Sequence, residues 1–178
     1  MTRDLDAIIR QAQSGDRTAF AGLIDDHYEM MFRFAHKYCG NRPDAEDVTQ
    51  LACIKVARSL GQFRFEARFT TWLYRLVLNC ARDFYKAQHS HEASTWPETA
   101  MNDGSEPKVL LHQVLKLVEC MGEGFRETLA LVIGEGLTHA EAAEVLAVKE
   151  STVSWRLHEV RKRLKADVGQ IGEYGGGA

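Results

Sequence analysis

The sequence lacks any apolar run near the roughly 20 residues that a membrane-spanning helix needs. Its first residues, MTRDLDAIIRQAQSGD, are polar and contain no apolar signal-peptide core. We therefore expect a cytoplasmic protein that does not insert into a membrane. Prolines are few, and apolar residues rarely alternate with polar ones, so the sequence favours helices over strands.

Cysteine and histidine are too sparse to indicate a disulfide framework or a metal site. No Cys-x-x-Cys pair occurs, and we expect free thiols, because disulfides do not persist in a reducing cytosol. The pairs His36-x-x-Cys39 and His89-x-His91 have no second pair at zinc-site spacing, so we expect no metal and no cofactor. An enzyme that uses a cysteine or a histidine is an alternative. No Ser/His/Asp order or phosphate loop supports it, so we expect no catalysis.

The net charge of −3 conceals two basic stretches. Residues 55–86 contain seven basic residues and two acidic ones, and residues 149–165 contain six and two. Two basic stretches on a mildly acidic chain predict two separate contacts with a polyanion. The charge distribution alone is equally consistent with two solvated helix faces. Sequence motifs must therefore distinguish polyanion binding from simple solvent exposure.

Helical periodicity divides the chain into two parts. In the first part we expect helices over residues 4–14, 18–39, 44–60 and 70–88. Residues 89–108 are polar and contain two prolines, which predicts a flexible linker. Helical patterns return over 109–168, and the glycine-rich segment 169–178 predicts a disordered tail. The expected fold is therefore all-α, with two small helical domains, 1–88 and 109–168.

The most specific motif lies in LTHAEAAEVLAVKESTVSWRLHEVRKRLK, residues 137–165. Thr138 and Glu141 have the spacing of a capping box, which satisfies free amides at a helix start. A short turn at Ala147 leads to a second helix whose apolar stripe comprises Val153, Leu157, Val160 and Leu164. This pattern is typical of a helix-turn-helix, whose second helix enters the major groove N-terminus first. An ordinary helical hairpin is the alternative.

Two further stretches are candidates for binding. In QFRFEARFTTWLYRLVLNCARDFYK, residues 62–86, aromatic rings can stack on unpaired bases while arginines follow phosphates. The loop 62–68 is the better part of this stretch, because its aromatic and basic residues lie off any helical stripe. The acidic run 44–47, at a helix start, either compensates the helix dipole or forms a docking face for a protein.

Together these segments resemble the extracytoplasmic-function group of bacterial RNA polymerase sigma factors. The resemblance rests on four fragments in order: AIIRQAQSGDRTAFAGLIDDHY, CGNRPDAEDVTQ, RFTTWLYRLVLNCARDFYK and LTHAEAAEVLAVKESTVSWRL. It implies that domain 1–88 is a region-2-like domain that binds core polymerase and reads and melts the minus-ten element. Domain 109–168 is then a region-4-like helix-turn-helix that reads the minus-thirty-five element.

The resemblance also implies roles for individual residues. The positions that match polymerase contacts are Asp44, Glu46, Asp47, Gln50 and Leu51. Those that match minus-ten contacts are Phe63, Arg64, Phe65, Glu66, Arg68, Asn79 and Arg82. The resemblance implies that the loop at 62–68 captures a base flipped out of the DNA strand. Unstacking the base costs free energy, and only a pocket that fits the base offsets that cost. The positions that match the major-groove face are Ser151, Thr152, Ser154, Trp155, Arg156 and His158.

Five residues depart from the family pattern. Leu51 replaces a common glutamate, and Lys149 replaces a usual serine cap of the recognition helix. Ser154 and Glu159 stand where lysine and arginine are common, and Trp155 replaces a small residue. These changes bear on the promoter sequence and on upstream affinity, while the family pattern as a whole is kept.

The implied partners are the β and β′ subunits of core RNA polymerase, promoter DNA and an anti-sigma factor. Without partners, the protein is expected to be a monomer. The alternative is a conventional two-domain helix-turn-helix regulator, which explains residues 137–165 equally well but leaves 62–86 unexplained. Such regulators usually dimerise on palindromic sites, so the oligomeric state separates the two hypotheses.

Overall fold

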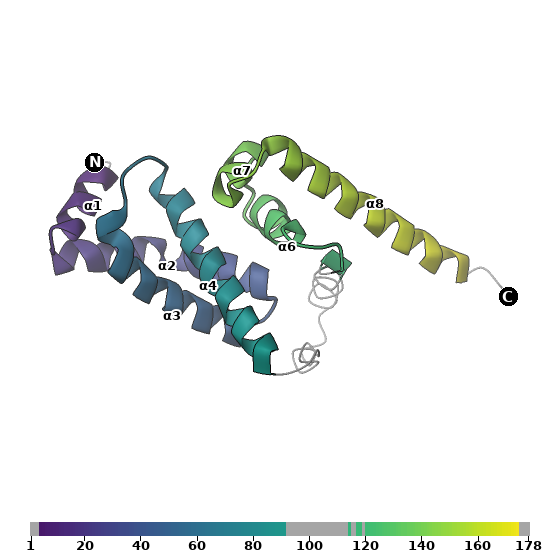
Figure 1. Cartoon of the computed structure of the whole chain (residues 1–178), viewed down its shortest axis with the longest axis horizontal. Helices are drawn as coiled ribbons and strands as arrows, with labels where there is room; N and C mark the ends of the chain where they lie inside the picture. Colours follow the sequence, from purple (N-terminus) through teal and green to yellow (C-terminus); the bar gives the residue numbers. More distant parts are fainter. Residues whose placement is uncertain (1–3, 92–113, 115–116, 119, 175–178) are drawn as a thin grey trace. The chain divides into compact units, whose positions relative to one another are not determined.

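A computed structural model of the chain describes residues 4–91, 114, 117–118 and 120–174, which form helices and contain no strand (Figure 1). The chain divides into two compact units, Met1–Trp96 and Pro97–Ala178. The prediction of an all-α fold with two helical domains is therefore confirmed. Of the predicted linker 89–108, the first three residues belong to the end of a helix and the others lie outside the described residues. None of the described helices is long and apolar enough to cross a membrane.

The first unit is a bundle of four α-helices with one short 3₁₀ turn. These elements are α1 (Leu5–Gln13), α2 (Arg17–Cys39), α3 (Arg42–Ser59), η1 (Leu60–Gln62) and α4 (Phe69–His91). Local side chains begin three of them. The carboxylates of Asp4 and Asp16 and the side-chain oxygen of Asn41 accept hydrogen bonds from amides of the first turns of α1, α2 and α3. Gly40, in the left-handed conformation, ends α2 and lets the chain turn directly into α3.

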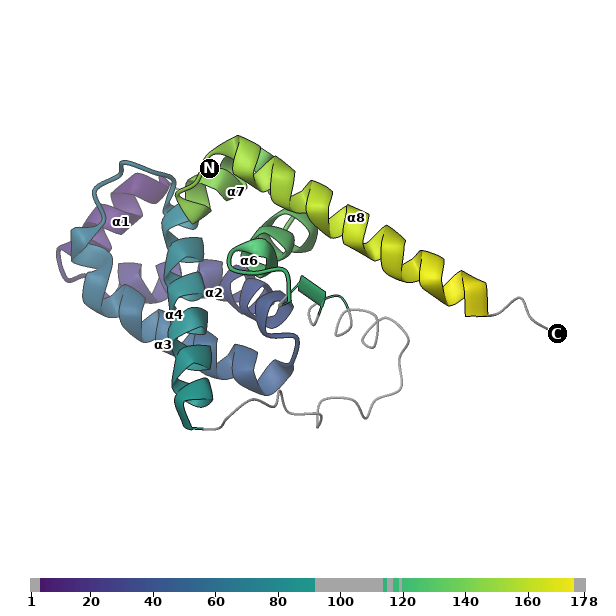
Figure 2. The same ribbon diagram turned by 45° about the vertical axis from the view of Figure 1, so that its right-hand side comes forward.

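Helix α2 packs against the other three helices of this unit, and α3 packs against α4 (Figures 1 and 2). The largest fully buried side chains at these contacts are Ile9, Leu23, Met31, Phe34, Val48, Val56, Leu73 and Val77. Burial of each such side chain contributes about 1.5–3 kcal/mol relative to exposure. Because α3 and α4 use one face each for this core, their opposite faces remain available for partners.

The second unit contains the predicted helix-turn-helix. Its elements are α6 (Phe125–Leu129), a π-helical turn η3 (Ala130–Gly134), α7 (His139–Leu146) and α8 (Glu150–Tyr174). The predicted capping box is present: Thr138 Oγ1 accepts from the Glu141 amide, and the Glu141 carboxylate accepts from the Thr138 amide. The predicted apolar stripe of α8 is also present, with Val153, Leu157 and Val160 buried and Leu164 half-buried.

The C-terminal helix continues further than the sequence pattern predicts. Backbone residues 169–174, which we expected in a disordered tail, form the last turns of α8, and 175–178 lie outside the described residues. Gly169 and Gly172 are isolated glycines. Each lowers helix propensity by about 1 kcal/mol but still supplies its amide to the helix, so neither ends it as a proline would.

The turn between α7 and α8 depends on one left-handed residue. Ala147 has φ +53°, a conformation that suits glycine and that a Cβ atom makes unfavourable. Its amide donates to the carbonyl of Glu144, and the Val148 amide donates to that of Ala143. These bonds close the end of α7 in the manner of a Schellman motif and direct the chain into α8.

We predict that Ala147→Gly stabilises the second unit. An L-residue in the left-handed region costs about 1–2 kcal/mol, and the extra freedom of glycine in the unfolded chain offsets about 0.4–1 kcal/mol. The expected gain in the free energy of unfolding is therefore between about 0 and 1.6 kcal/mol, measured by urea denaturation of the full chain. The matched control is Ala140→Gly, an exposed position within α7, where the same change should destabilise by a similar amount. Equal signs for the two variants would contradict this account.

Candidate functional site

The loop that joins α3 to α4 is anchored by an aromatic cluster, Phe63, Phe65, Phe69 and Trp72. Phe63 is 7% exposed, and its ring centroid lies 4.9 Å from that of Phe65 and 5.4 Å from those of Phe69 and Trp72. The rings of Phe69 and Trp72 stack at 5.5 Å. Phe63 therefore supports the loop from inside and does not present its ring to solvent. Offset and edge-to-face contacts of this kind hold aromatic rings in defined orientations.

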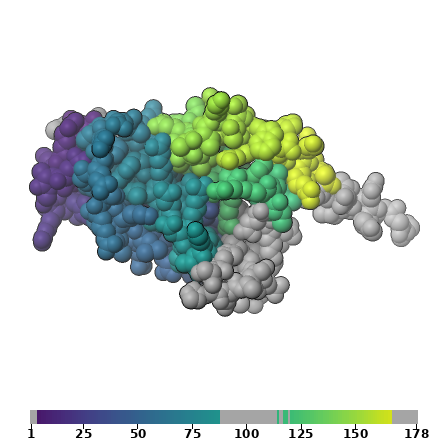
Figure 3. Space-filling model, viewed as in Figure 1, coloured from purple at the N-terminus to yellow at the C-terminus, as the bar shows by residue number. Residues whose placement is uncertain are grey.

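The remaining predicted residues of this loop lie at the surface. Arg64, Glu66 and Arg68 are exposed, and Phe65 is half-buried. Helix α1 lies beside the loop in both ribbon views, and the two adjoin on the surface of the first unit (Figures 1, 2 and 3). Two charged groups of opposite sign on a rigid loop can contact a phosphate and the polar edge of a base at the same time.

Helix α4 continues this basic surface. The sequence predicted two site residues on this helix, of which Asn79 is exposed and Arg82 is half-buried. Arg75 and Lys86, which we did not predict as site residues, lie three to four residues from them and so share their face of the helix. That spacing was visible in the sequence. The face is suited to follow a phosphate backbone, with Asn79 as its uncharged hydrogen-bonding group.

Two of the predicted polymerase-contacting residues have partners within the first unit. The Asp44 carboxylate accepts from Asn41 Nδ2 at 2.8 Å and from the Tyr85 hydroxyl at 3.2 Å, so it joins the start of α3 to α4. The Glu46 carboxylate forms an ion pair with Arg42 Nε at 2.7 Å, one turn away. Asp44 is thus part of the fold as well as of the acidic run, and Glu46 is partly neutralised.

The outer face of α3 presents a mixed stripe that we call the α3 stripe: Asp47, Gln50, Leu51 and Ile54. Asp47 and Gln50 are exposed, and Leu51 and Ile54 are 45% and 49% exposed. These positions are three or four residues apart and therefore lie on one side of the helix. Ile54 was not predicted, although its spacing from Gln50 and Leu51 places it on that side. Leu51 and Ile54 together form a small exposed apolar patch of the kind that a protein partner can cover.

The start of α8 forms the outer face of the helix-turn-helix. Ser151, Ser154 and His158 are exposed, Thr152 is half-buried, and Trp155 is 55% exposed. Ser154 Oγ is 2.8 Å from His139 Nδ1, which links the first turns of α7 and α8. The exposed Arg161, Lys162 and Lys165 follow along the helix. The arrangement places hydrogen-bonding groups near the N-terminus of α8 and cations further along it.

Arg156 differs from the other predicted residues of this face. Its side chain is half-buried, its Nη1 donates to Thr128 Oγ1 at 3.4 Å, and its guanidinium lies against the backbone of Gly124. A Cβ atom at Gly124 would collide with that guanidinium, so the glycine makes room for it. Arg156 therefore ties α8 to α6 inside the unit, whereas the sequence pattern placed it off the core stripe, toward DNA.

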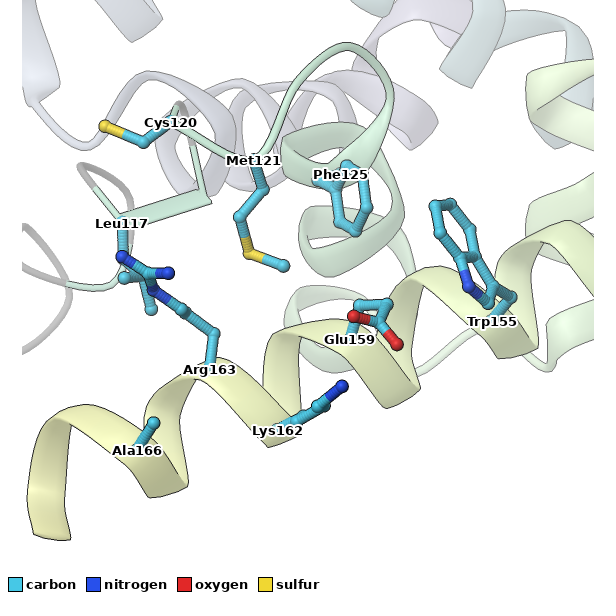
Figure 4. A pocket seen from close by; sticks show the side chains of 9 residues that line it. All are labelled: Leu117, Cys120, Met121, Phe125, Trp155, Glu159, Lys162, Arg163 and Ala166. Atoms are coloured by element: carbon cyan, nitrogen blue, oxygen red, sulfur yellow. The ribbon is translucent and has the colours of Figure 1, made fainter.

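A pocket of about 500 Å³ lies beside this face, between the segment 117–125 and α8 (Figure 4). Its lining consists of Leu117, Cys120, Met121, Phe125, Trp155, Glu159, Lys162, Arg163 and Ala166. The Trp155 ring makes an edge-to-face contact with Phe125, with centroids 5.5 Å apart. The tryptophan that departs from the family pattern thus packs against Phe125 and forms one wall of the pocket.

The thiols of Cys53 and Cys80 are poorly suited to act as nucleophiles. All four cysteines are free, and burial raises the pKa of both the Cys53 and Cys80 thiols. Thiols of raised pKa stay protonated and are poor nucleophiles. Among the described residues, no group of three or more histidine, cysteine or acidic side chains is placed to hold a metal ion.

Comparison with known families assigns both units. Residues 23–91 match the family model of sigma-70 region 2, and residues 117–166 match that of sigma-70 region 4. The first match spans the α3 stripe, the loop and α4, and the second spans the helix-turn-helix. A conventional two-domain regulator would explain only the second match, so that alternative is not favoured.

Individual relatives agree with these matches. The RNA polymerase sigma-H factor of Pseudomonas aeruginosa is 27% identical, over 88% of this chain and 90% of its own. The ECF RNA polymerase sigma factor SigW of Bacillus subtilis is 25% identical, over 88% and 92%.

A solved structure of CnrH in complex with the cytosolic domain of CnrY matches with a TM-score of 0.69. It is 26% identical and covers 94% of this chain and 99% of that one. The two family models, their order and the full-length relatives together lead to one assignment. This chain belongs to the extracytoplasmic-function group of RNA polymerase sigma factors.

Proposed function

We propose that this chain binds core RNA polymerase through the α3 stripe, reads and opens the minus-ten element with the loop 62–68 and α4, and reads the minus-thirty-five element with α8. The observation that carries the proposal is that each basic surface lies in a unit with its own sigma-70 match, region 2 first and region 4 second. In vitro transcription with core polymerase and a random promoter library tests it. Transcripts that depend on this protein and share two spaced elements are expected.

The α3 stripe supports the assignment of the polymerase contact. Burial of Leu51 and Ile54 against a partner removes apolar surface from water, which is the main driving force for association. Asp47 lies on the same side and adds a charge that restricts which partner surfaces fit. Asp44 acts on this contact indirectly, since its bonds to Asn41 and Tyr85 hold the start of α3 in place.

We predict that Asp47→Arg weakens the binding of core polymerase at least tenfold while leaving the protein folded. A reversed charge at a docking surface faces a partner that complements the original sign, and like-charge contacts cost several kcal/mol. Fluorescence anisotropy of labelled protein titrated with core polymerase measures the affinity. Asp26→Arg makes the same charge change at an exposed position of α2 and should leave affinity unchanged. Equal affinities for the two variants would remove α3 from the interface.

The loop 62–68 supports strand capture by its combination of rigidity and exposed polar groups. Its backbone is anchored by Phe63, while Arg64, Glu66 and Arg68 remain at the surface. A base flipped out of the duplex loses its stacking, and a fitted pocket compensates that loss only when its hydrogen bonds match the base. Glu66 is the exposed acceptor of the loop and so the group best suited to select a base with an amino group.

We predict that Glu66→Ala reduces opening of the minus-ten element and alters base preference at one position of it. The loss of a matched hydrogen bond to a base is worth about 1–3 kcal/mol of discrimination. Permanganate footprinting of unpaired thymines measures opening, and templates varied at each minus-ten position measure preference. Glu29→Ala, an exposed glutamate of α2, serves as the control. Unchanged opening and unchanged preference would exclude Glu66 from base capture.

The outer face of α8 supports reading of the upstream element. Near its N-terminus, which is the end that a recognition helix inserts, the helix exposes Ser151, Ser154, Trp155 and His158 beside the exposed Glu150. Because Arg156 is bound to Thr128, its proposed base contact requires that this bond be released or shared. The cations further along α8 are placed to contact phosphates.

We predict different effects for Trp155→Ala and Lys162→Ala on binding to the upstream element. Loss of Trp155 should change selectivity at one base pair, because its ring is the large apolar group able to contact a thymine methyl. Loss of Lys162 should weaken binding evenly across sequences. It should also lower the slope of log affinity against log salt concentration by about one, the value for one released counterion. Affinities for a panel of duplexes at several salt concentrations separate the two. Identical behaviour of both variants would contradict these roles.

The remaining partners are inferred from the family and from two solved structures. CnrH was solved with the cytosolic domain of CnrY, and RpoE of Bartonella quintana was solved with the anti-sigma factor NepR. By analogy we expect this chain to be controlled by an anti-sigma protein and to be a monomer without it. It acts in the cytoplasm, where polymerase and promoter DNA are found, and it changes the specificity of an enzyme without catalysing a reaction itself.

A further inference from the structure

The loop that is proposed to capture a base has a conformation that its own sequence disfavours. Phe65 has φ +61°, in the left-handed region that residues with a Cβ atom rarely adopt. Such backbone conformations persist only when the surrounding structure imposes them, and they occur preferentially at functional sites. Interactions from outside the loop must therefore select this conformation.

Gln13, the last residue of α1, supplies two of these interactions. Its Nε2 donates to the carbonyl oxygens of Leu60 and Phe63, both at 2.9 Å. One amide group thus uses both of its hydrogens to hold the carbonyl of the first residue of the 3₁₀ turn and that of the residue directly after it. Because the bonds join residues 47 and 50 positions apart, they fix the loop relative to a separate helix.

Arg10, one turn earlier on α1, supplies the third. Its guanidinium carbon lies 4.3 Å from the centroid of the Phe65 ring, within the range of a cation–π interaction. The ring also contacts Phe63, so it lies between a cation on one side and the anchored core of the loop on the other. The contact acts directly on the residue with the unfavourable backbone.

These polar contacts are separable from the packing that holds α1 on the domain. Ile9 is fully buried and Ala12 nearly so, and they anchor α1 through apolar contact. Gln13 is half-buried and Arg10 exposed, and neither is part of that core. Loss of either polar contact therefore leaves α1 attached and changes the loop alone.

We propose that Gln13 and Arg10 are positioning residues for base capture: they hold the loop 62–68 in its capturing shape without contacting DNA or polymerase. This inference rests on the proposed role of that loop. It assigns to α1, which precedes the region-2 match at 23–91, a part in the specificity of strand opening.

The test uses full-length variants with core polymerase on a promoter selected by the wild-type protein, at a temperature at which every variant is folded. Gln13→Met removes both hydrogen bonds and keeps the side-chain volume. We expect a reduction in open complexes of about fivefold for each bond lost, judged from typical net hydrogen-bond contributions. We also expect weaker base discrimination at the position where Glu66→Ala alters preference, with unchanged affinity for core polymerase. Gln11→Met, at an exposed position of the same helix, should behave like wild type.

A second pair of variants keeps the test decisive if Gln13→Met does not fold. Arg10→Gln removes the cation above Phe65 at an exposed position and should reduce opening about two- to fivefold. Arg10→Lys keeps the charge and should retain most of the activity.

The outcomes distinguish the proposed role of the loop 62–68 from the proposed role of Gln13 and Arg10. If Glu66→Ala changes neither opening nor preference at any position, Glu66 is excluded from base capture and the proposed function of the loop loses its base-selecting group. If Glu66→Ala does alter preference while Gln13→Met and Arg10→Gln keep wild-type opening and discrimination, this inference alone is overturned. A parallel loss of opening, core affinity and thermal stability would also overturn it, because that pattern indicates a purely structural role.

Discussion

The burial of Phe63 is the constraint on which the first unit's proposed DNA-binding surface depends. The chain leaves α3 through a short 3₁₀ turn and must reach α4 within a few residues, and Phe63 fixes this path by inserting into the core against Phe69 and Trp72. With that ring buried, its neighbours Arg64 and Glu66 are directed outward. A loop that already has its binding shape loses less conformational entropy when a base enters, so more of the contact energy remains for discrimination.

A hydrogen-bond network joins the start of α3 to the C-terminal part of α4. Asp44 accepts from Asn41 within its own helix start and from Tyr85 on α4, so one carboxylate both completes a helix cap and joins two helices. Asn41 in turn caps the amide of Asp44. The α3 stripe and the basic face of α4 are therefore carried by two helices that are joined at one end by this network and at the other by the anchored loop. If both surfaces act as proposed, polymerase contacts α3 close to the elements that hold the DNA strand.

Local rules were sufficient to predict most helices of the fold. Capping residues mark the helix starts at Asp4, Asp16, Asn41 and Thr138, and each does so through contacts within three residues. Periodicity likewise located the stripe of α8. These features could be predicted because sequence neighbours are also neighbours in space along a helix.

The contacts that could not be predicted join residues far apart in the sequence. Asp44 and Tyr85 are 41 positions apart, Arg156 and Thr128 are 28 apart, and Gln13 reaches a carbonyl 50 positions away. When a polar residue lies off an apolar stripe, the sequence pattern does not tell whether its side chain contacts solvent, DNA or another part of the protein. Only the tertiary arrangement determines this.

The inward position of Arg156 affects which chemical groups α8 presents along its length. With this guanidinium bound to Thr128, the N-terminal part of α8 presents hydroxyls, an imidazole, an indole and the carboxylate of Glu150. Such groups read hydrogen-bonding edges and thymine methyls and contribute little to phosphate attraction. The positive charge of the exposed face is concentrated further along, at Arg161, Lys162 and Lys165. If α8 reads the upstream element as proposed, selectivity and salt-dependent affinity arise from successive turns of one helix, and a change in promoter sequence preference can evolve at the first turns without loss of general DNA binding.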